Sequence, residues 1–291
     1  MCSDSESELD RLLNLTSRTF ALSIPLLPEP IRTQVGVGYL VFRLADTIED
    51  EGVATPAQRA ESLGAFKERL LSHRCEEADD LLRSWNHRHR PEQAGYAELL
   101  DRGEWVCAQL DGLEPAAAGR IRHHVARTAD GMAQRLLSPQ DIRDVAGVRA
   151  YCYQVAGIVG EMLTELFVLH HRPLEAHRAE LMDLSRAFGE VLQLVNILRD
   201  QGVDLDAGRR YVPDAAAYGR LLDLAQDNAA SARRYLEILR TADTPAGVVE
   251  FNAFNLGLAE ATLALLRQQG PGVKVDRDVV VQTLARVRVE T

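Results

Sequence analysis

The chain is 291 residues long and carries a formal net charge of −10, a size that fits one large domain or two smaller ones. The acidic balance argues against non-specific nucleic-acid binding and against strong attraction to anionic membranes. Aromatic residues make up only 5% of the chain and runs rich in Val, Ile and Thr are scarce, so we predict an all-α fold.

Helical periodicity, interrupted by proline, glycine and cap residues, predicts about ten or more helices with short connections. In chain order they are expected over residues 9–15, 39–50 (the end of a long helix that follows a proline cluster), 55–71, 79–89, 96–110, 115–137, 148–170, 177–200, 215–241 and 245–269, with a short one after 276. Two starts carry a Thr-Pro pair, Thr55-Pro56 and Thr244-Pro245, in which we expect the threonine to cap the helix. Short connections favour one compact domain over residues 1–291.

The cysteines and the N-terminus bear on the compartment. Cys2, Cys75, Cys107 and Cys152 show no CxxC spacing, which predicts free thiols in a reducing cytosol. The opening MCSDSESELD is acidic and polar, unlike a secretory signal. No apolar run approaches the roughly 20 residues that span a bilayer. We therefore expect a cytoplasmic protein with at most peripheral membrane contact and no evident protein partner.

The stretch from Tyr39 to Asp50 combines an apolar helix with a polar stripe. Asp46 and Asp50 are four residues apart on one helical face, and Arg43 and Tyr39 continue the same face backwards. Buried carboxylates need a cation, a partner or water, and a Mg²⁺-bound phosphate would satisfy that need. The alternative is an acidic pair on a solvated helix end.

A second stretch repeats this pattern. Gln193, Asn196, Asp200 and Asp204 fall on one face of a helix predicted to run from residue 187 to about 204. Two such helices would place four carboxylates across a cavity, an arrangement that holds Mg²⁺ ions against a diphosphate. Alternatively, Asn196 satisfies a neighbouring backbone and Asp204 caps the next segment. The guanidinium groups of Arg199, Arg209 and Arg210 match phosphate oxygens.

Between the two stripes lies a helix that begins with a tyrosine and contains small residues. Residues 156, 157 and 160 are Ala, Gly and Gly, which would let either another helix or an apolar ligand approach closely. Tyr151 could present its hydroxyl or its π-face to a carbocation, or serve as a partly buried structural tyrosine. The sequence contains no HExxH, zinc-type Cys/His spacing, Gly-rich phosphate loop or GxSxG motif, which argues against those chemistries.

These motifs together resemble the squalene/phytoene synthase family. They are Asp46-Thr-Ile-Glu-Asp50, Tyr151-Cys-x-x-Val-Ala-Gly-x-Val-Gly160 and Gln193-x-x-Asn196-Ile-x-Arg199-Asp200-x-x-x-Asp204 followed by Arg209-x-Tyr211-x-Pro213, preceded by Ser17-Arg-Thr-Phe-Ala21 and followed by Phe251-x-Ala253 with Ala261-Thr-Leu263. The resemblance implies an isoprenoid-synthase helical bundle around a central cavity. It also implies head-to-head condensation of two prenyl diphosphates, with farnesyl diphosphate as the expected substrate.

The resemblance also assigns roles to individual residues. Mg²⁺ would be bound by Asp46, Asp50, Asp200 and Asp204 with support from Asn196. Substrate would be bound by Ser17, Arg18, Phe20, Arg43, Gln193, Asn196, Arg199 and Arg209. The catalytic residues would be Tyr151, Tyr39 and Arg43.

Members of the family differ in the second reaction step, which is reductive with NADPH in squalene synthases and eliminative in dehydrosqualene and phytoene synthases. The segments Phe251–Leu263 and Gly272-Val-Lys274-Val look more like squalene synthases, and Lys274 and Arg277 would lie near NADPH. Four departures from the family pattern are Val203, Asn255, Leu256 and Asp276. Squalene formation is therefore the leading expectation. The alternatives are dehydrosqualene or phytoene synthesis, a terpene cyclase, or a silent member that acts as a binding subunit.

Overall fold

The structure is a computed structural model, and it describes residues 2–17, 19–72, 76–138 and 142–288. The described residues form helices and turns without a strand, so the predicted all-α fold is confirmed. Internal contacts divide the chain into two compact units, residues 1–25 with 29–140 and residues 26–28 with 141–291. The expectation of a single domain stays a prediction.

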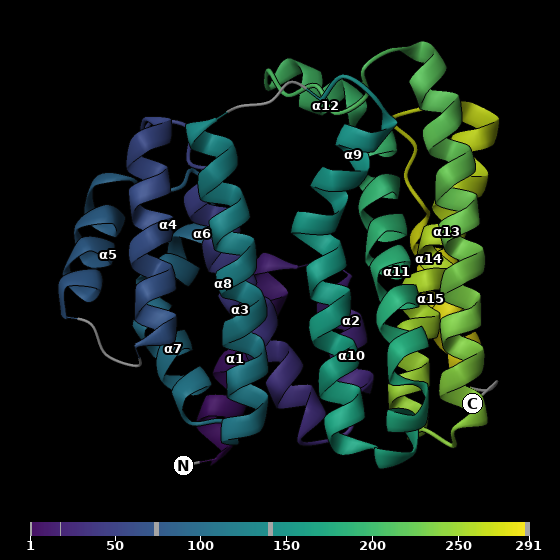
Figure 1. Cartoon of the computed structure of the whole chain (residues 1–291), viewed down its shortest axis with the longest axis horizontal. Helices are drawn as coiled ribbons and strands as arrows, with labels where there is room; N and C mark the ends of the chain where they lie inside the picture. The colour runs from purple at the N-terminus through teal and green to yellow at the C-terminus, as the bar shows by residue number, and fades with distance from the viewer. Residues whose placement is uncertain (1, 18, 73–75, 139–141, 289–291) are drawn as a thin grey trace. The chain divides into compact units, whose positions relative to one another are not determined.

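The first unit holds helices α1 to α8 (Figure 1). Their bounds are α1 (Cys2–Thr16), α2 (Phe20–Ser23), α3 (Ile31–Glu49), α4 (Pro56–Leu71), α5 (Glu76–Arg88), α6 (Ala94–Asp101), α7 (Gly103–Asp111) and α8 (Pro115–Leu137). Helix α3 packs against α4, α7 and α8 through fully buried side chains such as Leu40 and Val41. The polar stripe of α3 is therefore carried by a helix whose other faces form the core.

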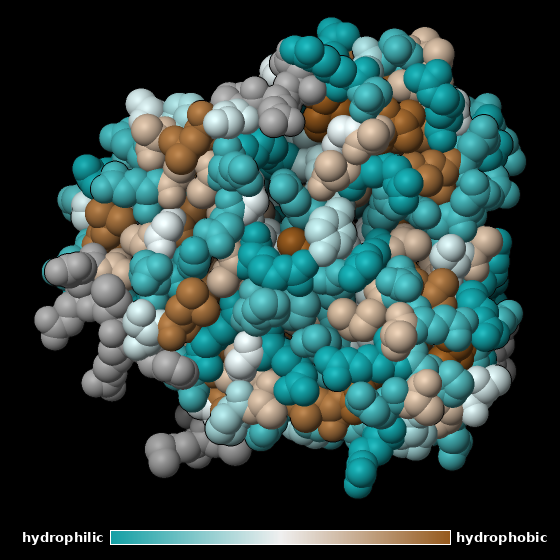
Figure 2. All heavy atoms as spheres, viewed as in Figure 1, coloured by the Kyte–Doolittle hydropathy of each residue, from teal (hydrophilic) through white to brown (hydrophobic). Residues whose placement is uncertain are grey.

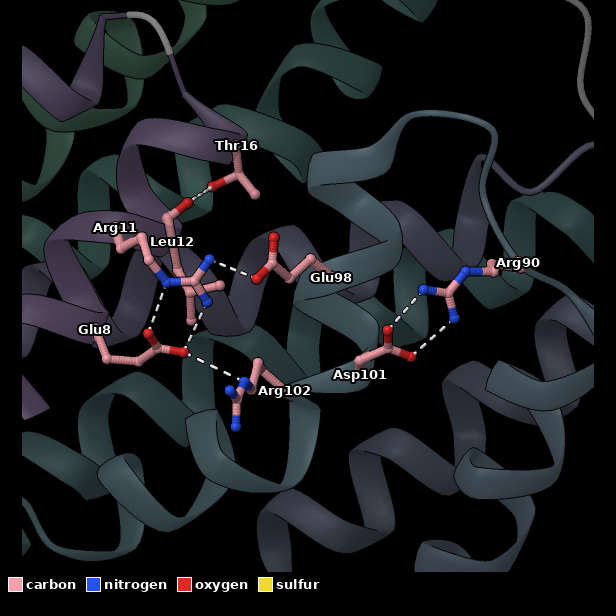
Figure 3. A network of polar contacts seen from close by, with 8 residues as sticks. All are labelled: Glu8, Arg11, Leu12, Thr16, Arg90, Glu98, Asp101 and Arg102. Atoms are coloured by element: carbon pink, nitrogen blue, oxygen red, sulfur yellow. Dashed lines mark hydrogen bonds and ion pairs between the residues drawn. The ribbon is translucent and has the colours of Figure 1, made fainter.

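Helix α1 is longer than predicted and lies against α6 (Figure 3). Arg11 pairs with Glu8 on its own helix and with Glu98 of α6, and Arg102 lies 3.3 Å from Glu8. The first half of α1 is almost entirely polar, so the sequence has no apolar period to reveal it. These partly exposed ion pairs each add little stability.

The predicted Thr-Pro helix starts have different outcomes. Thr55 caps α4 through a capping box: Thr55 Oγ1 accepts the Gln58 N–H at 3.2 Å, and Gln58 Oε1 accepts the Thr55 N–H at 2.9 Å. Thr244 does not cap α14 (Ala246–Gln269). Its Oγ1 is buried and has no hydrogen-bond partner within the described part of the chain, so that expectation was wrong.

The helix predicted over residues 96–110 is two helices, α6 and α7. The N–H of Arg102 is shared between the carbonyls of Glu98 and Leu99, at 3.0 and 3.1 Å. This tightened turn redirects the backbone just before Gly103. Apolar periodicity continues across the turn, which is why the sequence pattern predicted one helix.

The second unit is built around α11 (Arg178–Arg199), which packs against α10, α13 and α14 (Figure 1). The other elements are α9 (Val145–Cys152), a π-helical turn (Tyr153–Gly157), α10 (Ile158–His170), a 3₁₀ turn (Arg172–His177), α12 (Gln201–Asp206), α13 (Ala215–Thr241), α14 and α15 (Arg277–Val287). The predicted helix 148–170 is thus interrupted by a π-helical turn, where the Ile158 N–H bonds the carbonyl of Tyr153. One inserted residue leaves no mark on an apolar pattern.

Small residues let the π-helical turn and α10 lie directly against α11. A Cβ on Gly160 would lie 2.3 Å from the Ser185 carbonyl oxygen, and one on Gly189 would lie 2.2 Å from that of Ala156. Of the two alternatives for these residues, the structure shows the approach of another helix. These backbone-to-backbone contacts fix the packing of the π-helical turn and α10 on α11.

Residues Val145–His170 are, by length and composition, apolar enough to cross a membrane, against our expectation that no run approaches a span. Half of the apolar window is buried inside the protein, and Glu161, which is 2% exposed, pairs with Arg186 of α11 at 2.6 Å. A core helix passes the same test of composition. The view in Figure 2 shows a surface dominated by hydrophilic side chains, with hydrophobic ones in small groups.

The structure describes the side chains of two of the four cysteines. Cys107 and Cys152 are buried free thiols, as predicted. Burial raises the pKa of the Cys107 thiol to about 11 and that of Cys152 further still. Cys75 and the side chain of Cys2 lie outside the described residues.

Replacing Gly189 with alanine should destabilise the protein by about 1–3 kcal/mol, because a methyl group has no room against the Ala156 carbonyl. Gly219→Ala in α13 is the matched control, since nothing lies within 4 Å of its Cβ position. That control should raise stability by roughly 0.5–1 kcal/mol. Urea unfolding followed by circular dichroism measures both, and equal effects of the two variants would contradict the close approach.

Candidate active site

The last turns of α3 bring together the first polar stripe as predicted. Arg43 lies 3.2 Å from the Asp46 carboxylate and donates a hydrogen bond of 3.2 Å to the Tyr39 hydroxyl. The Tyr39 hydroxyl in turn donates to the Thr16 carbonyl at 3.0 Å. Asp50 is the exposed C-terminal cap of the helix. We call Tyr39, Arg43, Asp46, Glu49 and Asp50 the first acidic cluster.

The surroundings of Asp46 disfavour the charged form of its carboxylate. Burial raises the pKa of Asp46 to about 6, against the attraction of Arg43, and the neighbouring Asp50 and Glu49 raise it further. Burial likewise raises the pKa of Glu49, opposed by its ion pair with Arg135 of α8. Asp46 and Glu49 each pair with an arginine, Arg43 and Arg135, and Asp50 adds an exposed carboxylate at the end of the helix.

Two residues of this cluster region were not predicted. The ring of Tyr96 lies 5.8 Å from the Arg43 guanidinium, and the ring of Tyr39 lies 5.4 Å from it. Arg135 reaches Glu49 from α8. Neither residue stands in a motif, and both are separated from α3 in sequence, so no local signal could have found them.

Ser17 and Phe20, expected to bind substrate, lie at the start of α2 near the first acidic cluster. Ser17 Oγ accepts the Phe20 N–H at 2.9 Å, and the Phe20 ring packs on that of Tyr39 with centroids 5.4 Å apart. The third member of that group, Arg18, lies outside the described residues.

The second stripe does not lie on one continuous helix, which corrects the prediction for residues 187–204. Helix α11 ends at Arg199, Asp200 is its C-cap, and α12 begins at Gln201. The Arg199 guanidinium binds both oxygens of Asp200, at 2.8 and 2.6 Å. The Arg199 carbonyl accepts the N–H of Gly272 at 2.8 Å. The backbone angles of Asp200, a φ of −94° and a ψ of 12°, mark the break between the two helices.

The turn nevertheless keeps Asp200 and Asp204 in one place, because the Asp204 N–H bonds the Asp200 carbonyl at 2.9 Å. Asp204 also lies 3.3 Å from Arg209. We call Asp200, Asp204, Arg199 and Arg209 the second acidic cluster. Beside it is a small hollow. The hollow is lined by Ile197, Gln201, Asp204, Leu205, Arg209, Tyr211 and Val212.

Other predicted residues of this region differ in exposure. Asn196 is exposed on the last turn of α11 and Gln193 is partly buried one turn earlier. Val203, one of the departures from the family pattern, is 69% exposed. Arg210 is exposed beside Arg209.

Tyr151 is stacked on a second tyrosine. The rings of Tyr151 and Tyr211 lie 4.7 Å apart with planes inclined by 20°, and the Tyr151 hydroxyl donates to that of Tyr211 at 3.2 Å. Two residues earlier, Arg149 ties α9 to Glu190 of α11 at 3.0 Å. Tyr211 belongs to the Arg-x-Tyr-x-Pro motif, but its pairing with Tyr151 was not predicted.

The residues proposed for NADPH lie in the C-terminal part of the second unit. Lys274 and Arg277 are both exposed, on either side of Asp276. The turn before them contains Gly270 and Gly272 with φ of 80° and 83°, and the Gly272 N–H contacts the end of α11. The structure thus ties this segment to the second acidic cluster.

The carboxylates present fit Mg²⁺. Within the described part of the chain, no three His, Cys, Asp or Glu side chains converge as a preformed metal cage. Mg²⁺ is usually held by one or two carboxylates together with substrate phosphates and water. Asp46 with Asp50, and Asp200 with Asp204, each supply two hard oxygen donors of that kind. Burial is the main cause of the raised pKa of Asp46, and a bound cation would favour its charged form.

An all-α fold with two clusters of paired aspartate and arginine defines a class of protein suited to binding diphosphates. The family model for squalene/phytoene synthase matches residues 13–285. This chain belongs to the squalene/phytoene synthase family.

Relatives and solved structures agree with this assignment. Botryococcus squalene synthase of Botryococcus braunii is 30% identical over 67% of this chain and 39% of its own length. Squalene synthase ERG9 of Saccharomyces cerevisiae is 31% identical over 69% of this chain and 44% of its own length. The chain thus spans less than half the length of these curated relatives.

Two solved structures share the fold. TcSQS in complex with the ligand E5700 superposes with a TM-score of 0.79 at 24% identity, over 96% of this chain and 84% of that one. A dehydrosqualene synthase in complex with a ligand gives a TM-score of 0.62 at 20% identity, over 98% and 95%.

Asp46→Asn should stabilise the metal-free protein at pH 8. The folded-state pKa of Asp46 lies above its unfolded value, so its favourable contribution is full below the unfolded pKa and is lost as pH rises through about 6. Asparagine mimics the neutral acid at every pH. With allowance for partial solvent screening, we expect a gain of about 1–2 kcal/mol at pH 8 that shrinks towards zero at pH 4.

Thermal unfolding in a chelating buffer at both pH values measures this gain. Asp130→Asn, at an exposed ion pair with Lys67 of 2.9 Å, is the control and should change stability by less than about 0.5 kcal/mol at either pH. A loss of stability in Asp46→Asn at pH 8 would contradict the assigned pKa shift.

Proposed function

We propose that the chain catalyses the Mg²⁺-dependent head-to-head condensation of two farnesyl diphosphates to squalene, with NADPH as reductant. The observation that carries the proposal is that each acidic cluster places aspartates beside arginines, Asp46 with Arg43 and Asp200 and Asp204 with Arg199 and Arg209. A diphosphate can bind the same guanidinium groups that the carboxylates now occupy. Membership of the squalene/phytoene synthase family supports this choice of chemistry.

Substrate binding would exchange partners within each cluster. Arg43, Arg199 and Arg209 would turn from carboxylate to phosphate oxygens, and the freed aspartates would become metal ligands. When bound, Mg²⁺ would neutralise the charge that develops on the diphosphate leaving group. The ring of Tyr151 would stabilise the allylic cation and help to keep water away from it.

The role proposed for Tyr151 follows from its position two residues before the π-helical turn. Its half-buried ring would offer a π-face to the cation, and its hydroxyl would stay fixed against Tyr211. The product of the first step is a cyclopropyl diphosphate, which forms when the double bond of the second substrate attacks the cation. A proton is lost in that step and can be taken up by the released diphosphate, and the Tyr151 hydroxyl is the relay group we assign, which passes on one proton as it accepts another.

The second step separates squalene formation from its competitors. Exposed Lys274 and Arg277 are the cationic groups we assign to the phosphates of NADPH, and Tyr39 is the aromatic side chain assigned to this step. The expectation of a cytoplasmic enzyme is kept as part of the proposal.

Incubation with farnesyl diphosphate and Mg²⁺, with and without NADPH, tests the proposal. We expect squalene only when both Mg²⁺ and NADPH are present, and the cyclopropyl diphosphate when NADPH is left out. Dehydrosqualene or phytoene formed without NADPH would replace the squalene assignment by a carotenoid-type one. A single C15 or C20 hydrocarbon would indicate a cyclase, and no diphosphate release from any allylic substrate would indicate a silent family member.

Asp46→Ala and Asp200→Ala should each lower kcat by roughly 10³-fold or more, because each removes a metal ligand. Circular dichroism and gel filtration should show an unchanged fold. Asp223→Asn, which removes an exposed partner of Arg267, is the control and should keep full activity. Near-normal turnover of both alanine variants would refute the site.

A further inference from the structure

The stacked tyrosine that faces Tyr151 lies in a short segment between α12 and α13. We call residues 207–214 the strap. Tyr211 is its half-buried aromatic residue, and its ring and hydroxyl both contact Tyr151. The two tyrosines are 60 residues apart in sequence. Their contact therefore exists only because the strap runs back across the end of α9.

The strap is fixed on both sides of Tyr211. On the N-terminal side the Arg209 N–H bonds the Asp204 carbonyl at 2.7 Å, and the Gly208 N–H bonds that of Leu205 at 3.0 Å, with Gly208 at a φ of 76° that only glycine adopts readily. On the C-terminal side Asp214 caps α13 by accepting the Ala217 N–H at 2.6 Å. A loop tied down at both ends can hold its central side chain in one orientation.

Val212 adds an apolar anchor next to Tyr211. Its side chain is 4% exposed and lines the same hollow as Ile197 and Leu205. Tyr211 lines that hollow as well, and the buried Val212 anchors the segment that carries the Tyr211 ring. The burial of Val212 and the hydrogen bonds at both ends of the strap thus hold the Tyr211 phenol in a defined position.

We propose that Tyr211 is a positioning residue that acts through Tyr151, a role that rests on the proposed function. The stack, 4.7 Å between centroids, restricts rotation of the Tyr151 ring and so fixes the face offered to the allylic cation. The hydrogen bond of 3.2 Å sets the direction of the Tyr151 O–H. Both effects pre-organise the group before substrate arrives and cost nothing during reaction.

The strap also connects this pair to the second acidic cluster. Arg209 holds Asp204 by its side chain at 3.3 Å and by its backbone N–H, and Tyr211 follows two residues later. When Arg209 turns to a diphosphate, the backbone bond to Asp204 keeps the strap in place. Tyr211 therefore stays on Tyr151 while the side chains of the metal site rearrange.

A double-mutant cycle tests the proposal on the full-length protein with farnesyl diphosphate and Mg²⁺. Tyr211→Phe keeps the stack and loses the hydrogen bond, and should lower kcat about 3- to 10-fold with KM unchanged. Tyr211→Leu loses both and should lower kcat further. In a Tyr151→Phe background, Tyr211→Phe should change kcat by less than about twofold, because the group through which it acts is already altered.

Tyr218→Phe is the matched control. Tyr218 lies on the first turn of α13, and its buried hydroxyl has no hydrogen-bond partner within the described residues. This variant should keep wild-type kcat, and all variants should unfold at closely similar temperatures. A structural role alone would move the unfolding temperature rather than kcat at constant KM.

Each remaining outcome has a clear meaning. If the effects of Tyr211→Phe and Tyr151→Phe multiply independently, or if Tyr211→Phe is fully active, the positioning role is overturned while the proposed function stands. If the wild-type chain forms no condensation product from any prenyl diphosphate, the proposed function is overturned and the role of Tyr211 with it.

Discussion

The pairing of aspartate with arginine is the interaction on which both clusters depend. A carboxylate placed among apolar helix residues is costly unless a positive charge accompanies it. Arg43 meets this need for Asp46, Arg199 for Asp200 and Arg209 for Asp204. Each pair holds its aspartate in the folded protein, and each arginine is also the group best suited to bind a diphosphate. The same side chains thus serve in both states. Without metal, aspartate pairs with arginine; in the proposed substrate-bound state, aspartate binds Mg²⁺ and arginine binds the diphosphate.

The compensation in the first acidic cluster is incomplete, and this has a physical consequence. Asp46 keeps a pKa of about 6 although Arg43 lies 3.2 Å away, since burial and the neighbouring carboxylates outweigh that arginine. A bound cation would favour the charged form of Asp46 and so offset part of the cost of its burial. The second cluster is arranged differently, because Asp200 binds its arginine through two hydrogen bonds.

The backbone that presents these groups is set by close contacts between helices. Gly160 and Gly189 let α10 and α11 approach to backbone contact, and Arg149 anchors α9 to the buried Glu190, which also accepts from Asn228 at 2.8 Å. Between these points the π-helical turn inserts one extra residue. Turns of this kind often occur near functional residues, and here Tyr151 lies just before it. Rigid contacts on both sides of an irregular turn fix the side chain between them.

The sequence predicted the helices and the acidic stripes because both depend on local periodicity. It placed the start of α4 at Pro56 and the polar face of α3 correctly, since capping and the i, i+4 spacing are properties of neighbouring residues. It failed where one residue changes the backbone without changing the pattern, as at Arg102, at the π-helical turn and at Asp200. Tyr96, Arg135 and the stack of Tyr211 on Tyr151 were missed because those partners come from distant parts of the chain.

The end of α11 shows how such a local break can serve function. In a continuous helix through residue 204, the Arg199 carbonyl would accept a hydrogen bond within the helix. Because the helix breaks, this carbonyl instead accepts the Gly272 N–H at 2.8 Å. The same break directs the strap back towards α9. Three segments that are distant in sequence therefore meet at one helix end: the second acidic cluster, the tyrosine stack and the turn before Lys274. An irregular helix terminus, because it leaves carbonyls unpaired, can organise more of a site than a regular helix would.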